Sequence, residues 1–305
     1  MEVHDIPRIK GVWSIRLELA EEWTKWYKAH RRLDITIYPA TNTDESLDST
    51  FLSEGVGLPH PETGWGPTAK VGIMPHFMAP GSGLLTTVPR NLMEQDWGFS
   101  TGAATYLAAA YAAAVFGLIK QIQVSLSKEK IANVLSASSS PMHFFDGEKK
   151  GKSLAPVTQQ GPGLINAYEA AIATVVPNVQ SIYIGEMHEI TAKVPDPVWS
   201  LKIENRGSEA ITLKQVYKGT TVYYALNDER RTAFPPEIRS ESGGAQFREP
   251  RITIKEGTSE TITFGLTGLF NDRERDRIPI QSGFVTLVDT KRKMKPLIIP
   301  YWGFM

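Results

Sequence analysis

The sequence predicts an α/β region followed by an all-β sandwich, and three observations indicate this order. The run from Thr101 to Gln121 is apolar and rich in alanine, which is typical of a helix buried inside an α/β domain. Ser127 then precedes a segment of helical periodicity as an N-cap residue would, and this predicts a second helix that ends at the serine-rich residues 138–140. Short β-rich runs follow from about residue 181 to the end.

The first part of the chain shows weaker patterns. Residues 15–32 place aromatic and aliphatic side chains among charges at helical spacing, which predicts an amphipathic helix, and residues 33–39 alternate like a strand. Residues 41–64 are polar and rich in turn formers, so we expect a loop or linker. Residues 70–78 and 83–88 are expected to form two buried strands, and Ser100 or Thr101 to cap the apolar helix.

The β-rich runs divide the chain into parts. About eight strands in about 120 residues, with no helix between them, are typical of an immunoglobulin or fibronectin sandwich. The predicted parts are an N-terminal segment with linker over 1–60, an α/β part over 61–180 and a sandwich over 181–305. The strands are expected at 186–194, 198–204, 211–217, 221–226, 251–255, 259–266, 283–288 and 297–301.

Composition excludes several classes of function. Lys plus Arg equals Asp plus Glu at 33 each, so no strong field favours nucleic acid or an acidic membrane, and Arg230, Arg231 and Arg248 are too sparse for a nucleic-acid patch. With no cysteine, the chain has neither disulfides nor a thiolate metal site, and no cofactor is predicted. The start, Met1 to Arg8, lacks the features of a signal peptide, which favours the cytoplasm.

A series of motifs gives a more specific prediction. Gly64-Trp-Gly-Pro-Thr68, Met74-Pro-His-Phe-Met-Ala-Pro-Gly81, Ile131-Ala-Asn-Val-Leu-Ser-Ala137 and Gln159-Gln-Gly-Pro-Gly-Leu-Ile-Asn-Ala-Tyr168 occur in this order. In order and spacing they resemble the C-terminal half of the catalytic domain of subtilisin-like serine peptidases, or subtilases. The resemblance implies a partial subtilisin-like three-layer α/β remnant over 61–180.

The C-terminal part extends the resemblance. Ser200 to Gly207, Ser282 to Val285 and Ile299 to Gly303 are similar to the fibronectin-III-like domain that follows the catalytic domain in large cell-envelope and fungal subtilases. Residues 1–60 would then include the tail of a protease-associated domain. Because the family is mostly secreted, the resemblance and the missing signal peptide point to different compartments.

The catalytic groups of the family are not matched. The motif Gly-Thr-Ser-Met-Ala-Thr-Pro, which carries the nucleophile, falls on residues 100–106 and places Gly102 at the serine. The family's Asp, His and oxyanion Asn precede the matched region, and the upstream residues here match them poorly. We therefore expect no catalytic residue and no peptidase activity. The remnant of the cleft would comprise Gly64, Trp65, Gly66, Pro67, Ala79, Pro80, Gly81, Ser100 and Thr101.

Two histidines and two acidic segments are not expected to take part in catalysis or metal binding. His76 and His143 lie nearest the degenerate motif, yet neither has the sequence context of a catalytic base. Asp146-Gly-Glu148 and residues 271–276 lack the spacing of a calcium loop, so we expect solvated turns and no metal site.

Three functions remain open at this point. The first is a catalytically inactive subtilase homologue that binds a protein or peptide. The second is a serine endopeptidase whose Asp and His half is missing from this chain. The third is a membrane-anchored binding protein that uses the apolar run over 97–119, although its alanine content disfavours insertion. Near-zero net charge and a sheet with an open edge also predict self-association.

Overall fold

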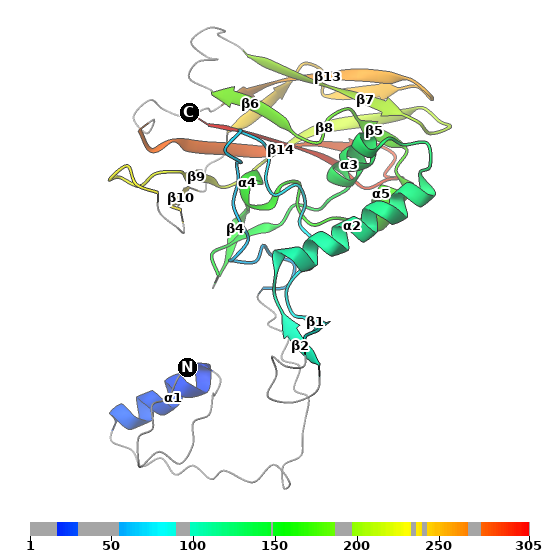
Figure 1. The fold of residues 1–305 in the computed structure, drawn as a ribbon. Helices are drawn as coiled ribbons and strands as arrows, with labels where there is room; N and C mark the ends of the chain where they lie inside the picture. Colours follow the sequence, from blue (N-terminus) through cyan, green and yellow to red (C-terminus); the bar gives the residue numbers. More distant parts are fainter. Residues whose placement is uncertain are drawn as a thin grey trace. The chain divides into compact units, whose positions relative to one another are not determined.

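A computed structural model of the chain describes residues 17–29, 55–89, 98–147, 149–186, 197–232, 236–239, 243–267 and 276–304. The chain divides into two compact units, Met1–Phe51 and Leu52–Met305, which are considered separately. In the first unit, helix α1 (Leu17–Lys28) confirms the amphipathic helix expected there (Figure 1). The strand predicted at 33–39 lies outside the described residues.

The larger sheet of the second unit has seven strands. Its central path runs β10-β9-β14-β15-β6, and β8 joins β14 to β12. Every pair is antiparallel except β15 with β6. The strands are β6 (Ile182–Glu186), β8 (Ile211–Gly219), β9 (Val222–Tyr224), β10 (Ile238–Arg239), β12 (Arg251–Ile254), β14 (Pro279–Asp289) and β15 (Leu297–Phe304).

A four-stranded antiparallel sheet, ordered β11-β13-β7-β5, forms the second layer. Alternate side chains of β13, such as Ile262, Phe264 and Leu266, are buried because successive residues of a strand point to opposite faces. The strands are β5 (Val175–Pro177), β7 (Val198–Asn205), β11 (Gly244–Phe247) and β13 (Ser259–Thr267).

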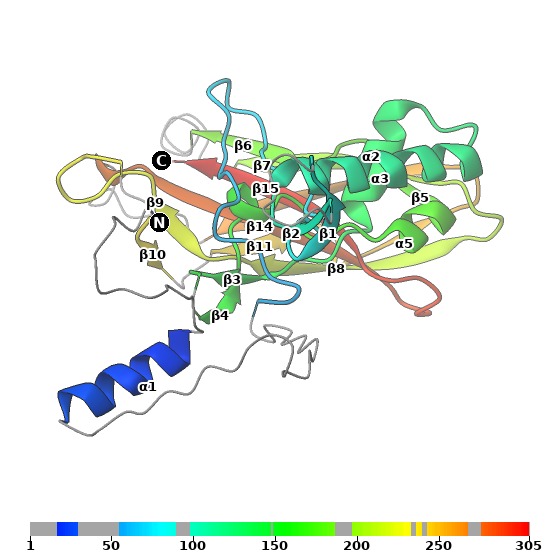
Figure 2. The same cartoon turned by 60° about the horizontal axis from the view of Figure 1, so that its bottom comes forward.

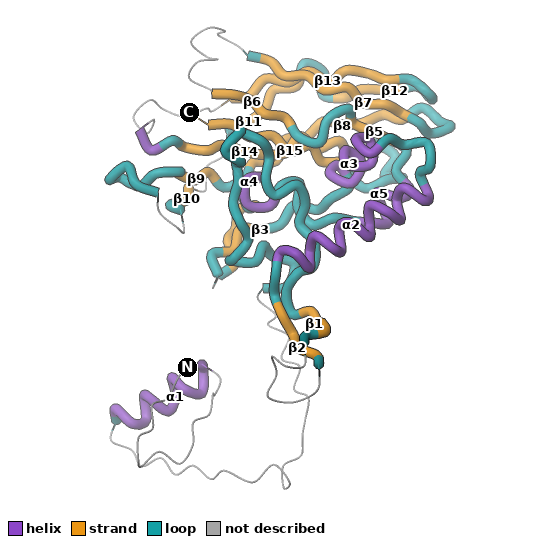
Figure 3. Tube along the Cα trace, viewed as in Figure 1, coloured by secondary structure: helices purple, strands orange, loops and turns teal. Residues whose placement is uncertain are grey.

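The two sheets share one hydrophobic core. Ile203 and Phe264 of the smaller sheet belong to the same buried cluster as Leu213, Val285 and Tyr301 of the larger one. Two sheets that bury a common face in this way form a sandwich. The all-β part of the predicted fold is therefore confirmed, and Figure 3 shows its strands gathered together, with α2 along one side of them.

The region before the sandwich contains helices and two separate antiparallel hairpins. Among residues 55–180 that the structure describes, β1 pairs only with β2 and β3 only with β4, so the parallel sheet of a three-layer α/β remnant is not formed. The elements are β1 (Leu84–Thr87), β2 (Phe99–Gly102), α2 (Thr105–Ile122), α3 (Lys128–Ala137), β3 (His143–Phe145), β4 (Lys150–Leu154), α4 (Val157–Gln160) and α5 (Ala167–Ile172).

Local sequence patterns correctly predicted the second helix but wrongly predicted two buried strands. Ser127 caps α3, since its side chain accepts a hydrogen bond of 3.3 Å from Lys130 N. Residues 70–78, expected as a buried strand, form turns with a single bridge at Met78. Residues 83–88 contain β1, whose side chains are half-exposed or exposed, so the expectation of burial was wrong.

Buried contacts join this helical region to the sandwich. Val157 of α4 packs with Phe284, Ile298 and Trp302 of the larger sheet. Val157 N also donates 2.9 Å to the hydroxyl of Ser282 in β14. Figure 2 shows α3 beside β15 from a second direction. These contacts hold the segments that carry the motifs against the sandwich.

Candidate functional site

Gly102 is the last residue of strand β2 and lies opposite Leu84 of β1. The following helix begins at Thr105, so Gly102 has extended backbone and lies outside the helix. A Cβ placed on Gly102 would meet no heavy atom within 4 Å, and its φ is not in the left-handed region. A serine would therefore fit at Gly102.

The predicted capping role of Ser100 and Thr101 was wrong. Both residues belong to β2, where Ser100 pairs with Thr86, and the N-cap of α2 is Ala104, which has no side-chain hydrogen bond. Because the main-chain N–H and C=O groups of this segment pair with β1, the segment forms a strand and is not part of helix α2. The Ser100 hydroxyl donates to the main-chain oxygen of Thr101, at 3.3 Å.

The Ala79-Pro80-Gly81 segment contacts the start of α2. Ala104 N donates 2.8 Å to the main-chain oxygen of Gly81. A Cβ on Gly81 would lie 2.9 Å from Ala108 Cβ and 3.0 Å from Ala104 O, closer than such atoms ordinarily approach. Glycine at this position therefore permits the close approach of the loop to the helix.

The segment Gly64-Trp65-Gly66-Pro67 contacts the larger sheet. Gly66 N donates 2.7 Å to Thr158 O, and the Tyr223 hydroxyl of β9 donates 3.1 Å to Gly66 O. The ring of Trp65 meets Tyr223 edge to face, with ring centroids 5.2 Å apart. Burial raises the pKa of Tyr223 above its ordinary value, so the phenol stays protonated and continues to donate.

Main-chain hydrogen bonds connect the segments around residues 78 and 163, which belong to two of the sequence motifs. Met78 N donates 3.0 Å to Gly163 O, and Ile165 N donates 2.9 Å to Met78 O. Leu164 also bridges Ser140. The segments around residues 78, 140 and 163 thus lie together, although they are far apart in the sequence.

The two candidate histidines make no catalytic pair. The structure gives His76 a contact through its main-chain oxygen, which accepts 3.3 Å from Gln180 Nε2. His143 lies in β3, where its Nδ1 is buried without a hydrogen-bond partner in the part of the chain that the structure describes. In those residues neither ring is hydrogen-bonded to a hydroxyl or carboxylate, the contact that general-base catalysis needs.

Helix α2 is mostly exposed, which corrects the expectation of a buried helix. Only Val115 and Ile119 are buried, and they pack with residues of α3 and α5. Tyr111, Leu118 and Ile122 recur at i, i+7 and i+11 and are 46%, 57% and 64% exposed. We call these three side chains the outer face of α2. By length and composition alone, α2 could cross a membrane.

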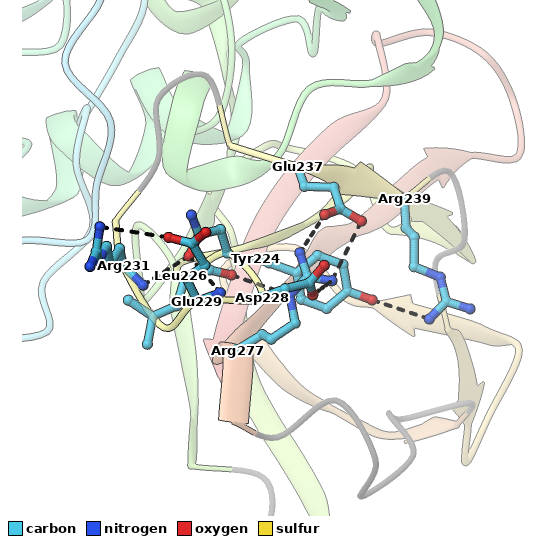
Figure 4. A network of polar contacts seen from close by, with 9 residues as sticks. Tyr224, Leu226, Asp228, Glu229, Arg231, Glu237, Arg239 and Arg277 are labelled. Carbon is cyan, nitrogen blue, oxygen red and sulfur yellow. Dashed lines mark hydrogen bonds and ion pairs between the residues drawn. The ribbon is translucent and has the colours of Figure 1, made fainter.

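A polar cluster near the start of β14 centres on Arg277 (Figure 4). Its guanidinium lies 4.0 Å from the centroid of the Tyr224 ring, pairs with Glu237 and lies 3.2 Å from an oxygen of Asp228. The hydrogen bond with Glu237 raises the pKa of Arg277. Arg277 Nε also donates 3.3 Å to Leu226 O. These contacts fix the loop after β9 against β14, a structural role that the sequence did not indicate.

The acidic turns show no grouping suited to a metal ion. Asp276 pairs with Arg230 at 2.5 Å, and Asp146 accepts 2.7 Å from Lys149 N. Glu148 and residues 271–275 lie outside the described residues. Within the described ranges, three or more His, Asp or Glu side chains do not come together in a way that could hold a metal.

The structure also shows a cavity of about 800 Å³ that sequence reasoning missed. Its walls come from α5, from the turn between β7 and β8, from the hairpin between β14 and β15 and from Ser138 at the end of α3, and they include none of the residues predicted for the cleft. The one sequence signal was the basic run Lys291-Arg-Lys-Met-Lys295 in that hairpin.

Comparisons with known proteins give one similarity in sequence. No family model matches the chain. The chain is 30% identical over 111 residues to Bacillopeptidase F of Bacillus subtilis (strain 168), a match that covers 35% of this chain and 7% of that protein. The chain therefore has a weak similarity to a serine protease over a small part of its length.

Solved structures give only distant likenesses. The PapD-like domain 7 of human CEP192 has a TM-score of 0.29 at 12% identity, covering 43% of this chain and 84% of that one. The CsuC–CsuE chaperone–adhesin complex of Acinetobacter baumannii has a TM-score of 0.26 at 12% identity, with 43% and 57% covered. The secreted serine protease VesC of Vibrio cholerae has 0.22 at 12%, with 40% and 21% covered. TM-scores this low carry no argument about fold or function.

Proposed function

We propose that this chain is a subtilisin-like serine peptidase homologue that lacks peptidase activity and serves as a protein-binding unit. The observation that carries the proposal is the degenerate nucleophile motif. Gly102 stands where the family has serine, in a chain whose other motifs follow the family's order. Without a hydroxyl at this position no acyl-enzyme forms.

The surroundings of Gly102 support this proposal. The residue lies in β2, whereas the family's serine opens the central helix, and its neighbours Ser100 and Thr101 are strand residues. His76 and His143 make no ring hydrogen bond to a hydroxyl within the described residues. Loss of the serine or histidine of such a triad lowers turnover by about a millionfold. A partial activity is therefore not expected.

Casein and a chromogenic peptide test the proposal. We expect turnover at the level of the buffer blank for the native chain, for Gly102→Ser and for the matched control Gly102→Ala. Both substitutions fit the space around Gly102 and should leave the circular dichroism spectrum unchanged. Turnover by the native chain would overturn the proposal. Turnover by Gly102→Ser alone would show that the other catalytic groups are present.

The binding role is supported by the outer face of α2. Apolar side chains this exposed, next to an alanine-rich surface, are typical of a helix that another protein covers. A net charge of zero gives little repulsion between copies, so a second copy of the chain is one such partner. We therefore propose that the chain associates with itself or with a protein partner through α2.

The exposed helix also favours a second candidate, a membrane-anchored binding protein. The inner side of α2 argues against it, because Val115, Ile119 and the partly buried Phe116 pack with α3 and α5. Lys120 Nζ in addition donates 2.8 Å to both Val124 O and Leu126 O, which ties the helix end to the folded chain. Partition into buffer after lysis supports the protein-binding candidate, and retention in the membrane fraction until detergent is added supports the anchor.

A third reading, an active endopeptidase whose Asp and His lie outside this chain, is disfavoured by Gly102. Absence of those two residues alone would have left the serine in place. Turnover upon mixing the chain with a polypeptide that carries the missing residues would establish this reading.

A further inference from the structure

The cavity beside α5 combines apolar walls with a cationic rim. Ile172, Ile211 and Leu297 contribute apolar surface from three segments of the chain. The hairpin between β14 and β15 adds Lys291, Arg292, Lys293 and Lys295, all exposed to solvent. A site with this composition can accept a ligand that has both an apolar body and negative charge.

The carboxylates in the cavity wall form ion pairs or hydrogen bonds with other residues of the wall. Glu209 pairs with Lys293 at 2.9 Å, and Glu169 pairs with Lys295 at 3.4 Å. The buried Asp289 accepts hydrogen bonds from the main-chain nitrogens of Lys291 and Lys293, at 2.9 and 2.8 Å. Each acidic side chain in the wall therefore has a partner within the wall.

Lys291 and Arg292 are the other two cations that the hairpin contributes to the rim. Neither Lys291 nor Arg292 forms an ion pair with any residue that the structure describes, although Lys291 contributes with Lys293 to the lowered pKa of Glu209. Arg292 N donates 3.0 Å to Asp289 O, and Arg292 has a φ of 55°, so a defined turn presents both cations. Their positive charge is available to an anion from outside.

The wall of the cavity holds an unpartnered polar group. Ser138, at the end of α3, is 8% exposed, and its Oγ has no hydrogen-bond partner among the described residues. Ser138 also contributes to the cavity lining. A buried hydroxyl without a partner is costly, and a peptide amide or carbonyl in the cavity would satisfy it.

We propose that this cavity binds an acidic peptide segment. A carboxylate of the peptide pairs with Lys291 and Arg292, an apolar side chain next to it contacts Ile172 and Leu297, and the peptide backbone bonds Ser138 Oγ. Lys291 and Arg292 select an acidic peptide over a neutral one, because the apolar walls alone would accept either equally well. The proposal is independent of Gly102 and of the fate of the peptidase chemistry.

Fluorescence anisotropy with two labelled peptides tests the site. The acidic probe is Leu-Glu-Leu-Asp-Leu, and its neutral match is Leu-Gln-Leu-Asn-Leu. We expect the acidic probe to bind the native chain about tenfold more tightly than the neutral one, and the difference to shrink as salt is added. Equal binding of the two probes, or no binding of either, would overturn the proposal.

Variants locate the binding. Lys291→Gln with Arg292→Asn removes both free cations, and asparagine tolerates the left-handed backbone at Arg292. We expect this double variant to weaken binding of the acidic probe about tenfold. The control, Lys218→Gln with Arg248→Gln, removes the same charge at exposed positions outside the cavity and should leave binding within about twofold. An equal loss in both double variants would show unspecific attraction and overturn the proposal.

A cavity-filling variant keeps the test valid if the hairpin variant misfolds. Ala210→Trp places a bulky side chain at the cavity wall without changing charge, so it should abolish binding of the acidic probe. Unchanged binding by Ala210→Trp would overturn the assignment of the peptide site to this cavity.

Inorganic phosphate, added as a competitor, should displace the probe far less well than unlabelled acidic peptide does. Equal displacement by phosphate would show a simple anion site and overturn recognition of a peptide.

Discussion

The hydroxyl of Tyr223 donates a hydrogen bond of 3.1 Å to the main-chain oxygen of Gly66, a residue 157 positions earlier in the chain. Strand β9 of the sandwich therefore holds the Trp-Gly-Pro segment that resembles the floor of a subtilase cleft. Trp65 packs on the same tyrosine ring, so one residue of the sandwich contributes both a polar and an aromatic contact.

Replacing Tyr223 by phenylalanine tests this contact. Tyr223→Phe keeps the ring beside Trp65 but leaves Gly66 O without the hydroxyl, which should lower the free energy of unfolding by about 1 kcal/mol. Urea unfolding followed by tryptophan fluorescence measures the change. The exposed Tyr106→Phe is the control and should unfold like the native chain. Equal stability of Tyr223→Phe and the native chain would show that the bond contributes nothing.

A methyl group at Gly81 should separate the loop from the start of α2. In Gly81→Ala the new Cβ would lie within 2.9 Å of Ala108 Cβ, so the loop or the helix must shift, at a cost of about 1–3 kcal/mol. Gly102→Ala is the matched control, because its Cβ meets no atom within 4 Å. Chemical denaturation compares the two. If they lose equal stability, the close approach at Gly81 is not the cause.

Charge on the outer face of α2 should prevent self-association. We expect Leu118→Glu with Ile122→Lys to reduce the molecular mass measured by light scattering at high micromolar concentration to that of a monomer. The pair lies one turn apart, and its opposite charges support the helix while removing the apolar surface. Val198→Lys, an exposed change on the sandwich, should leave association intact. A native chain that is already monomeric would contradict the prediction.

Buried tyrosines should make the fold sensitive to alkali. Burial raises the pKa of Tyr223 and of Tyr301, so the folded chain holds these protons more tightly than the unfolded chain does. The stabilisation is complete below the ordinary tyrosine pKa of about 10 and is lost as the pH rises above it. Circular dichroism against pH, with tyrosinate absorbance recorded in parallel, should show unfolding and ionisation together. Ionisation of all tyrosines near pH 10 with the fold intact would contradict this.

Local signals in the sequence predicted several elements well. Ser127 caps α3 as expected because a cap depends on the few residues around it. The β-rich runs at 198–204, 211–217 and 259–266 correctly predicted β7, β8 and β13, each of which buries side chains in the sandwich core. The short strands β10 and β11 were missed, since each has too few residues to show a period.

Features that depend on distant partners were not predictable. Ser100 and Thr101 look like capping residues, but pairing with β1 makes them part of a strand. The composition of α2 shows that the helix is apolar, yet it does not show what covers the helix, and the outer face is exposed. The cavity was missed because its walls come from segments far apart in the sequence that only the fold brings together. The division of the chain at residues 60 and 180 stays a prediction.

Labelling with a fluorophosphonate shows whether the chain carries an activated nucleophile. The native chain and Gly102→Ser are each incubated with the reagent, and their intact masses are measured, with an active subtilisin-like peptidase as the positive control. Because activation of a serine needs the neighbouring base, we predict no added mass on either protein. Stoichiometric addition of one phosphonyl group to a hydroxyl of the native chain would contradict the loss of peptidase chemistry, since it would show that the chain has an activated nucleophile.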